Sequence, residues 1–527
     1  MKKSFAGARD LVFLAAFGLR ALFLFQWSRT PYFLFPRLDD QAHQLWALEI
    51  LHGGLLHDRA FYQSPFYPYF LALLYKIVGV RPAAMLWLQA AAGAFACVVL
   101  ARVAARLFTP RAGLIAGIFA ALYKPFIFYT AFLLKETWVV LGLSLFCLAA
   151  LEVQGSKRAR DAFYCGLALG LTALSRGNVL LLAPVLPLLW LGLSRTSAAR
   201  LTGSFCVGLC LAILPATLHN ALASRDLVPI TYTPGFSFFI GNNPEATGTT
   251  HFPLGISSSP LGEETESVAR AEAEEGRALK PSEVSRHWFR RALEFIRDDP
   301  SRALTLTATK FLLFWNSREL PDDYDPVFLA KHTDTLLSWP LPSFRFVAAL
   351  ALAGVLLFFR SPGQRLLLVL AGLYMLSVVV TLVSDRYRLP MLVFLIPFAA
   401  AASDRLLGCR TWEDLKAPAW ALFGALPMIA VVNAPLAPYS ASDESQGWVG
   451  LSEIYIDRGE YARALDAFYR AFRAAPERLG KDGFFFGGAA AEKLGDFKTA
   501  RIIYRAGLEL HPADGALAKK MAVLPPK

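Results

Sequence analysis

The sequence is poor in charged residues. Only 18% of its 527 residues are charged and 55% are hydrophobic, whereas soluble proteins carry roughly 25% charged residues. This balance excludes a soluble globular enzyme, and it excludes a disordered chain because so much apolar surface can be buried. Several apolar runs approach the roughly 20 residues that a helix needs to cross a bilayer. The composition therefore predicts an all-α, polytopic membrane protein.

Cysteines are also few, and the common motifs of soluble enzymes are missing. The six cysteines form no CxxC pair, which argues against a disulfide framework and against a zinc site. The patterns GxxxxGK[ST], HExxH, GxSxG and GxGxxG do not occur, so the chain has no signature of a P-loop, a zincin, a nucleophile elbow or a dinucleotide fold. The sequence requires no cofactor. It offers no support for a divalent metal, although Asp323-Tyr324-Asp325 has the letters of a DxD motif.

The net charge of +12 is explained by basic residues in the loops. Lys and Arg residues gather between apolar runs, where they hold loops on the cytoplasmic side of a membrane. Nucleic acid is therefore not an expected partner, whereas the lipid bilayer is.

Eleven apolar runs predict about 11 transmembrane helices, with an uncleaved first helix whose N-terminus is cytoplasmic. The alternation of basic loops places residues 29–82 and 223–343 on the outer side. Residues 302–316 are too short and polar for a clear span, and we interpret them as an interfacial helix with Arg302 and Lys310 near lipid headgroups. If they cross instead, the C-terminus moves to the cytoplasm. The predicted spans lie at about 11–25, 83–105, 112–130, 133–153, 162–175, 178–194, 201–222, 344–359, 366–383, 389–403 and 417–434.

The composition divides the chain into a membrane domain, residues 1–435, and a C-terminal helical domain, residues 446–527. The second contains a repeat in which small and large residues recur at tetratricopeptide spacing, first from Trp448 to Pro476 and then, 36 residues later, from Ala491 to Pro512. Two repeats are fewer than the three or so that a free-standing solenoid needs. We therefore expect this module to pack against the membrane domain or against a protein partner.

The polar segment Pro36-Arg37-Leu38-Asp39-Asp40-Gln41-Ala42-His43 follows the first apolar run. Adjacent carboxylates repel each other, so one of the two aspartates is expected to have a raised pKa unless a cation or a substrate proton compensates. Such a group is suited to accept a proton from an incoming hydroxyl. The alternative interpretation is that one of them only caps the helix that starts near Gln41. Capping by one and catalysis by the other are compatible.

The stretch from Leu38 to Tyr75 resembles the first external loop of the GT-C glycosyltransferases, specifically the bacterial relatives of the dolichyl-phosphate-mannose protein mannosyltransferases. In that family an acidic pair opens the loop and a Ser-Pro-Tyr-Pro-like element precedes the second span, as Ser64-Pro65-Phe66-Tyr67-Pro68 does here. The resemblance covers roughly residues 8–405. It also includes Leu134-Lys135-Glu136-Thr137, Ser175-Arg176-Gly177-Asn178, Gly241-Asn242-Asn243-Pro244, Ser317-Arg318-Glu319 and Arg386-Tyr387-Arg388-Leu389-Pro390.

This resemblance implies inverting transfer of a sugar from a polyprenyl-phosphate carrier to a lipid, glycan or protein acceptor at the outer face of a bacterial inner membrane. Asp39 is then the expected general base, with Asp40, at a position usually held by Glu, as the second acidic residue. A departing lipid phosphate needs cations, and we expect them to be Lys135, Arg176, Arg318, Arg386 and Arg388. Residues expected to line the site are Glu136, His43, Tyr67, Asn242, Asn243, Glu319 and Tyr387.

Each of these residues also has a purely structural interpretation. Lys135 can extend to the interface, Arg176 can be a turn residue, and Arg386 with Arg388 can anchor the chain to headgroups. The aromatic stretch from Gly235 to Pro244 is expected to be strand-like and to suit sugar recognition, and the acidic run from Glu263 to Glu275 to be a solvated helix face.

Two rival functions remain open. A surface polysaccharide ligase or polymerase is also polytopic with a large outer loop, but it does not explain the acidic pair after the first span. A lipid-linked sugar transporter or flippase predicts a repeated span architecture and charges near the middle of the membrane, whereas the charges here gather at one face.

Overall fold

The computed structural model describes residues 2–250, 253, 256–257, 259–512 and 514–525, with side chains from residue 9 onward, so the side chains of Lys2 and Lys3 lie outside the described residues. The chain forms two compact units. The first unit consists of residues 1–24, 37–322 and 340–436, and the second of residues 25–36, 323–339 and 437–527.

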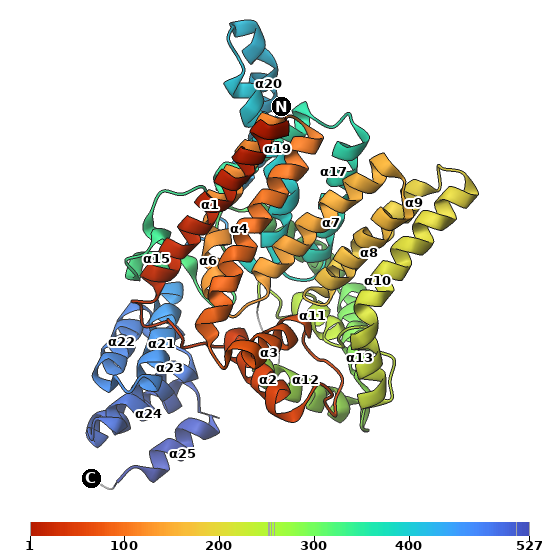
Figure 1. Ribbon diagram of the computed structural model, residues 1–527. Helices are drawn as coiled ribbons and strands as arrows, with labels where there is room; N and C mark the ends of the chain where they lie inside the picture. The colour runs from red at the N-terminus through yellow and green to blue at the C-terminus, as the bar shows by residue number, and fades with distance from the viewer. Residues whose placement is uncertain (1, 251–252, 254–255, 258, 513, 526–527) are drawn as a thin grey trace. The chain divides into compact units, whose positions relative to one another are not determined.

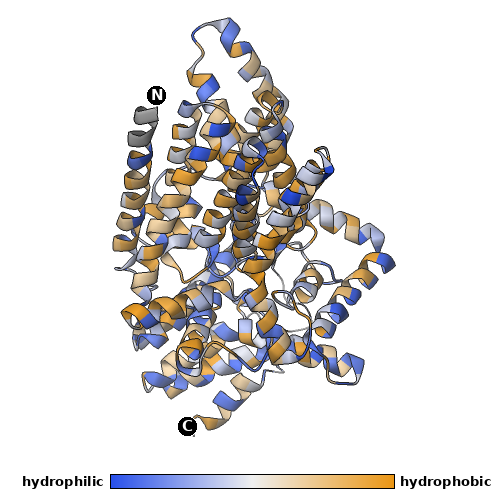
Figure 2. Cartoon of the chain, turned by 45° about the vertical axis from the view of Figure 1, so that its right-hand side comes forward, coloured by the Kyte–Doolittle hydropathy of each residue, from blue (hydrophilic) through white to orange (hydrophobic). Residues whose placement is uncertain are grey.

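Seven helices of the described residues are long and apolar enough to cross a membrane. They are α1 (Lys2–Trp27), α4 (Pro82–Leu107), α7 (Glu136–Ser156), α10 (Arg195–Ser224), α17 (Pro362–Val379), the continuous pair α18 (Asp385–Arg388) and α19 (Leu392–Leu407), and α20 (Trp412–Asn433). Figure 2 shows hydrophobic residues, in orange, along much of the long helices. The prediction of an all-α, multi-pass membrane protein is confirmed.

The other four predicted spans are also helical but shorter or broken. Helices α5 (Pro110–Leu122) and α6 (Lys124–Phe128) form one candidate span that bends by 59°, because Tyr123 is extended and Pro125 starts a new first turn. Helix α8 (Ala159–Ala173), the segment Gly177–Trp190 with α9 (Val185–Trp190), and α16 (Phe344–Leu357) are shorter than 18 residues. The eleven-span topology therefore stays a prediction.

Glycine allows α8 and α10 to pack with their backbones in contact. A methyl group added at Gly166 would lie 1.9 Å from the Phe205 carbonyl oxygen, and one added at Gly208 would lie 2.1 Å from that of Phe163. Small residues permit this close approach of helices in membranes, where the lipid provides no hydrophobic driving force. Arg176 follows α8 by three residues.

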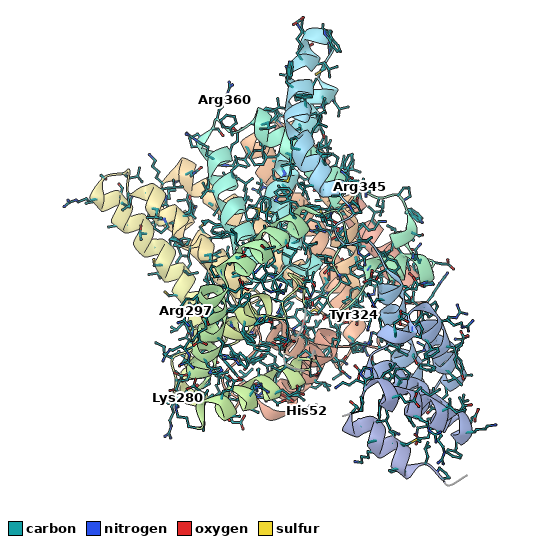
Figure 3. All side chains as sticks on the ribbon, turned by 180° about the vertical axis from the view of Figure 1, so that it is seen from behind. His52, Lys280, Arg297, Tyr324, Arg345 and Arg360 are labelled. Atoms are coloured by element: carbon teal, nitrogen blue, oxygen red, sulfur yellow. The ribbon has the colours of Figure 1, made fainter. Side chains whose placement is uncertain are left out.

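The predicted outer loops also fold into helices. The first contains α2 (Asp39–Gly53) and α3 (Phe66–Val78), and the second contains α11 (Pro234–Gly241), α12 (Pro260–Glu275), α13 (Pro281–Asp298) and α14 (Pro300–Trp315). Proline occupies the first turn of each of the last four, where its missing N–H costs nothing. Figure 3 shows α13 between its labelled ends, Lys280 and Arg297.

Two expectations for the second loop are wrong. The aromatic stretch after Gly235 is the helix α11 rather than a strand, because Phe236 and Phe239 pack on Trp288 of α13 at one-turn spacing. Lys310 of α14 does not lie near headgroups. Its side chain is fully buried, and its ammonium donates to the carbonyl oxygens of Gly241 and Thr381 at 3.0 and 2.9 Å.

The second unit is built on the helices α21 (Ala441–Asp457), α22 (Tyr461–Ala474), α23 (Lys481–Lys493), α24 (Phe497–Leu510) and α25 (Gly515–Val523) (Figure 1). Consecutive helices from α21 to α25 contact each other. Gly487 and Gly488 lie against the rings of Phe468 and Tyr504, so small and large residues interlock as the repeat pattern requires. Assignment of this unit to the tetratricopeptide class stays a prediction.

Segments far apart in the sequence complete the second unit. Helix α15 (Pro326–His332) packs Phe328 against the Trp448 ring, and His332 pairs with Glu444. Arg458 lies over the Phe35 ring. The unit therefore includes residues 25–36 and 323–339, which the composition had assigned to the membrane domain.

Candidate active site

The acidic pair opens helix α2. Asp39 and Asp40 occupy its first turn, and the N-cap position before them is held by Leu38. Leu38, just before them, has a φ of 50°, a left-handed conformation that is strained for a residue with a bulky side chain. Backbone strain of this kind concentrates at functional sites.

Arg386 connects two carboxylates that are distant in sequence. Its guanidinium donates to Asp39 Oδ2 at 2.7 Å and to Asp322 Oδ2 at 2.7 and 3.0 Å. The Arg386 side chain is 9% exposed, and the side chains of Asp39 and Asp322 are 15% and 10% exposed. Gln63 donates to the other oxygen of Asp39 at 3.3 Å. Through these contacts Arg386 of α18 connects Asp39, at the start of α2, with Asp322, which follows α14.

The charge of Arg386 controls the protonation of Asp39. Burial raises the pKa of the Asp39 carboxyl, but the nearby charges of Arg386 and Lys135 outweigh burial and hold its pKa well below the usual range. Arg386 is therefore a cation that compensates for repulsion within the acidic pair, and the pKa of Asp39 is not raised. Asp39 is ionised, as a proton acceptor must be.

Behind the acidic pair lies a buried polar layer. Asp40 is 4% exposed and His43 is fully buried. The His43 ring packs on Tyr67 at 5.1 Å, its Nδ1 lies 2.9 Å from the Leu133 carbonyl oxygen, and the Tyr67 hydroxyl donates to Gln89 at 2.7 Å. Burial, together with the charge of Lys135, lowers the pKa of His43 to about 4. A neutral His43 here supports the backbone of α2 and the segment before α7.

Lys135 precedes the first residue of α7, and its charge acts on Asp39. Burial lowers the pKa of its ammonium, and the charge of Asp39 opposes that change. Within the described part of the chain its ammonium takes part in no ion pair or side-chain hydrogen bond, although Asp39, Glu136, Arg176 and Arg386 all act on it electrostatically. Lys135 is therefore available to an anionic ligand.

Arg176 and Glu136 form a buried ion pair beside Lys135. Their closest atoms are 2.9 Å apart and the side chains are 6% and 1% exposed. The Arg176 guanidinium also lies over the ring of Tyr387, 4.5 Å from its centroid. The pair brings three predicted site residues together at the end of α8.

The remaining predicted cations and amides form hydrogen bonds within the protein. Arg388 is 2% exposed, pairs with Glu319, and donates to the carbonyl oxygens of Phe314, Asn316 and Arg318. The backbone N–H of Arg318 donates to the Asn316 side chain at 3.1 Å.

The side-chain amides of Asn242 and Asn243 donate to main-chain oxygens, and Asn242 also accepts from Lys310. In this arrangement the side chains of Arg388, Asn242 and Asn243 form hydrogen bonds within the protein and connect segments of the chain around the site.

Sequence reasoning missed Asp322 and the contribution of the acidic run to this region. Asp322 had one available signal, its position directly before the DxD letters. Glu263 accepts from the Tyr62 hydroxyl at 2.8 Å, and burial raises the pKa of Glu263 to about 7. The start of α12 therefore faces inward, contrary to the expectation of a solvated face. Asp325 of the DxD letters caps α15 through the N–H groups of Val327 and Phe328.

Residues 62–219, less than a third of the chain, match the family model of dolichyl-phosphate-mannose-protein mannosyltransferase. This match confirms the predicted relationship over that segment, which contains Tyr67, Lys135, Glu136 and Arg176. None of the curated proteins compared with the sequence matches it.

Three solved structures are among those similar to this chain. The Archaeoglobus fulgidus oligosaccharyltransferase complexed with Zn and sulfate has 16% identity and a TM-score of 0.45, over 86% of this chain and 56% of that one. The archaeal oligosaccharyltransferase AglB from Archaeoglobus fulgidus, with an inhibitory peptide and a dolichol-phosphate, has 14% identity and a TM-score of 0.48, over 98% and 72%. ArnT from Cupriavidus metallidurans bound to undecaprenyl phosphate has 14% identity and a TM-score of 0.35, over 81% and 88%.

Proposed function

We propose that this chain, which matches the mannosyltransferase family over residues 62–219, is an inverting GT-C glycosyltransferase that uses a polyprenyl-phosphate sugar as donor. The observation that carries the proposal is the position of Lys135. Its ammonium lies within electrostatic range of the Asp39–Arg386 pair and has no anionic partner in the described residues. Transfer of a sugar from a phosphate leaving group needs a carboxylate that accepts a proton and a nearby cation that can bind the phosphate.

The donor phosphate would bind Lys135 and compete with Asp39 for Arg386. Asp322 would keep Arg386 at the site during this exchange, because it accepts two of the guanidinium N–H groups. Once Arg386 turns toward phosphate, Asp39 loses the cation that lowers its pKa most, and burial makes it a stronger base. Donor binding would thereby activate the base.

The chemical step then balances without a bound cofactor. The acceptor hydroxyl loses its proton to Asp39, its oxygen forms a bond to the anomeric carbon, and the bond from that carbon to the phosphate oxygen breaks. The electron pair leaves with polyprenyl phosphate, whose developing charge Lys135 and Arg386 stabilise. Attack opposite the leaving group inverts the anomeric configuration.

The donor class can be tested with purified protein. Incubation with a panel of undecaprenyl-phosphate monosaccharides should release undecaprenyl phosphate for at least one sugar, detected by mass spectrometry. Undecaprenyl-pyrophosphate oligosaccharides serve as the comparison. Release from the pyrophosphate donors alone would contradict the proposed donor and favour the rival ligase or polymerase.

For location we propose the bacterial inner membrane, with the site and the second unit on the outer side. With eleven spans, cysteines introduced at the exposed positions Arg473 and Lys498, in a background lacking the six native cysteines, should react with an impermeant thiol reagent in intact spheroplasts. Labelling that appears only after lysis would place the second unit in the cytoplasm and would make the number of spans even.

A further inference from the structure

A separate pocket of about 130 Å³ lies beside the proposed active site, between α2, residues 57–63 and the start of α12. Its wall on α2 consists of Ala42, Leu45, Trp46 and Glu49, which share one face of the helix by their spacing. Asp39 lies one turn before Ala42 on the same face. Helices α2 and α12 contact each other, and His52 marks the end of α2 in Figure 3.

The pocket adjoins the proposed base through one side chain. Gln63 lines the pocket and donates to Asp39 Oδ1 at 3.3 Å. Trp46 lies seven residues after Asp39, which corresponds to roughly 10 Å along a helix. A ligand in the pocket is therefore too far away to react but close enough to be attached to the group that does.

The aromatic wall of the pocket is held in place by its neighbours. The Trp46 indole N–H donates to His57 at 3.3 Å, and its ring lies 5.6 Å from that of Phe61. Phe61 in turn stacks on His219 at 4.0 Å. Because these contacts fix the indole before any ligand arrives, binding would require little reorganisation.

Charged groups surround the aromatic wall. Glu49 and Arg59 are exposed lining residues, and Glu264 lies 3.9 Å from Arg59 and accepts from the Tyr232 hydroxyl. A pyranose ring matches this combination. Its C–H face can pack on the electron-rich face of an indole, and the hydroxyl groups on its edge can bond to carboxylate and guanidinium groups.

The volume of this pocket suits a ligand the size of a single sugar ring. It exceeds the roughly 10–15 Å³ that one water molecule needs and falls below the roughly 300–1,000 Å³ of pockets for larger ligands. A lipid chain would gain nothing from Glu49, Arg59 and Glu264. We propose that this pocket binds a sugar unit of the acceptor next to the unit that reacts at Asp39, so that the acceptor is a glycan. This inference rests on the proposed function. Of the lipid, glycan and protein acceptors that the resemblance implies, it selects the glycan.

Binding can be measured without turnover, by saturation-transfer NMR on the full-length protein in detergent. The probes are methyl α-mannopyranoside, methyl β-galactopyranoside and methyl N-acetyl-β-glucosaminide, with the peptide acetyl-Ser-Tyr-Ser-amide as comparison. At least one glycoside should receive saturation. Trp46→Ala should weaken that signal about fivefold or more, because the stacking face is lost, whereas Trp412→Ala, at a tryptophan that is 73% exposed, should not change it.

If Trp46→Ala does not fold, Trp46→Phe and Glu49→Gln decide the matter: the first should retain part of the signal and the second should weaken it. Absence of glycoside binding, binding that Trp46 and Glu49 do not affect, or Trp46-dependent binding of the peptide alone would overturn the inference. Failure of the proposed function would appear differently, as wild-type protein that releases no undecaprenyl phosphate.

Discussion

Replacing Asp39 with Asn is expected to reduce sugar transfer by about a hundredfold or more, since a positioned general base contributes roughly that much. The amide has nearly the same shape but is a far weaker base. Transfer would be measured as release of undecaprenyl phosphate at saturating donor. Asp298→Asn is the matched control, because it makes the same change at a carboxylate that is 64% exposed on α13.

The same experiment separates the two members of the acidic pair. Asp40→Asn should be less harmful, because Asp39 is the carboxylate that contacts Arg386 and Gln63. Retention of more than about a tenth of wild-type turnover in Asp39→Asn would remove Asp39 from the role of base. A large loss confined to Asp40→Asn would assign the base to Asp40.

The pH dependence of kcat/KM provides a further check on Asp39. This quantity reports groups of the free enzyme, in which the pKa of Asp39 lies well below its usual range. The carboxylate is therefore already ionised, and no loss of kcat/KM from Asp39 is expected as the pH falls from about 8 to about 5. Arg386→Ala removes the largest lowering influence, so an acid limb should then move upward into a measurable range.

The second large effect is expected for Lys135→Ala. A hydrogen bond to a charged group contributes roughly 1.5–3 kcal/mol, so loss of the ammonium should lower kcat/KM for the donor by roughly 10- to 150-fold. The Michaelis constant for the acceptor should change much less. Lys135→Arg should restore part of the donor affinity, because it retains the charge, and Lys76→Ala, at an exposed position of α3, is the control.

Arg386→Ala is also expected to impair use of the donor, but with a second consequence. It leaves Asp39 and Asp322 without their shared cation, so its effect combines lost phosphate binding with an altered base. Unchanged donor kinetics in both Lys135→Ala and Arg386→Ala would show that neither residue binds phosphate, and would leave anchoring or structural support as their role.

How much of the fold was predictable depends on which interaction shapes each segment. The apolar runs of α1, α4 and α10 can be recognised as membrane helices from the sequence alone, because a long apolar stretch has few alternatives to a membrane helix. Helix α11 was mistaken for a strand because its aromatic residues favour strands locally, and only their packing on Trp288 of α13 makes it a helix.

For the site, local sequence was enough to single out Asp39, Lys135 and Arg386, since charged residues at the ends of apolar runs are rarely without a function. It could not separate these from Arg388, Asn242 and Asn243, which are also polar residues that the resemblance had placed at the site. The difference lies in their partners. The side chains of Arg388, Asn242 and Asn243 donate hydrogen bonds to main-chain oxygens, whereas Arg386 pairs with Asp39 and Lys135 acts on Asp39 electrostatically.

The sequence by itself determined that this protein is an all-α membrane protein, related over residues 62–219 to protein mannosyltransferases, with an acidic pair after its first apolar run. Only the tertiary structure decided that Arg386 joins Asp39 to Asp322 across 347 and 64 positions of sequence, and that Asp39 therefore has a lowered pKa. Composition and helical periodicity are local properties of a chain. The protonation of a buried carboxylate depends instead on charges within a few ångströms in space, and folding alone determines which charges those are.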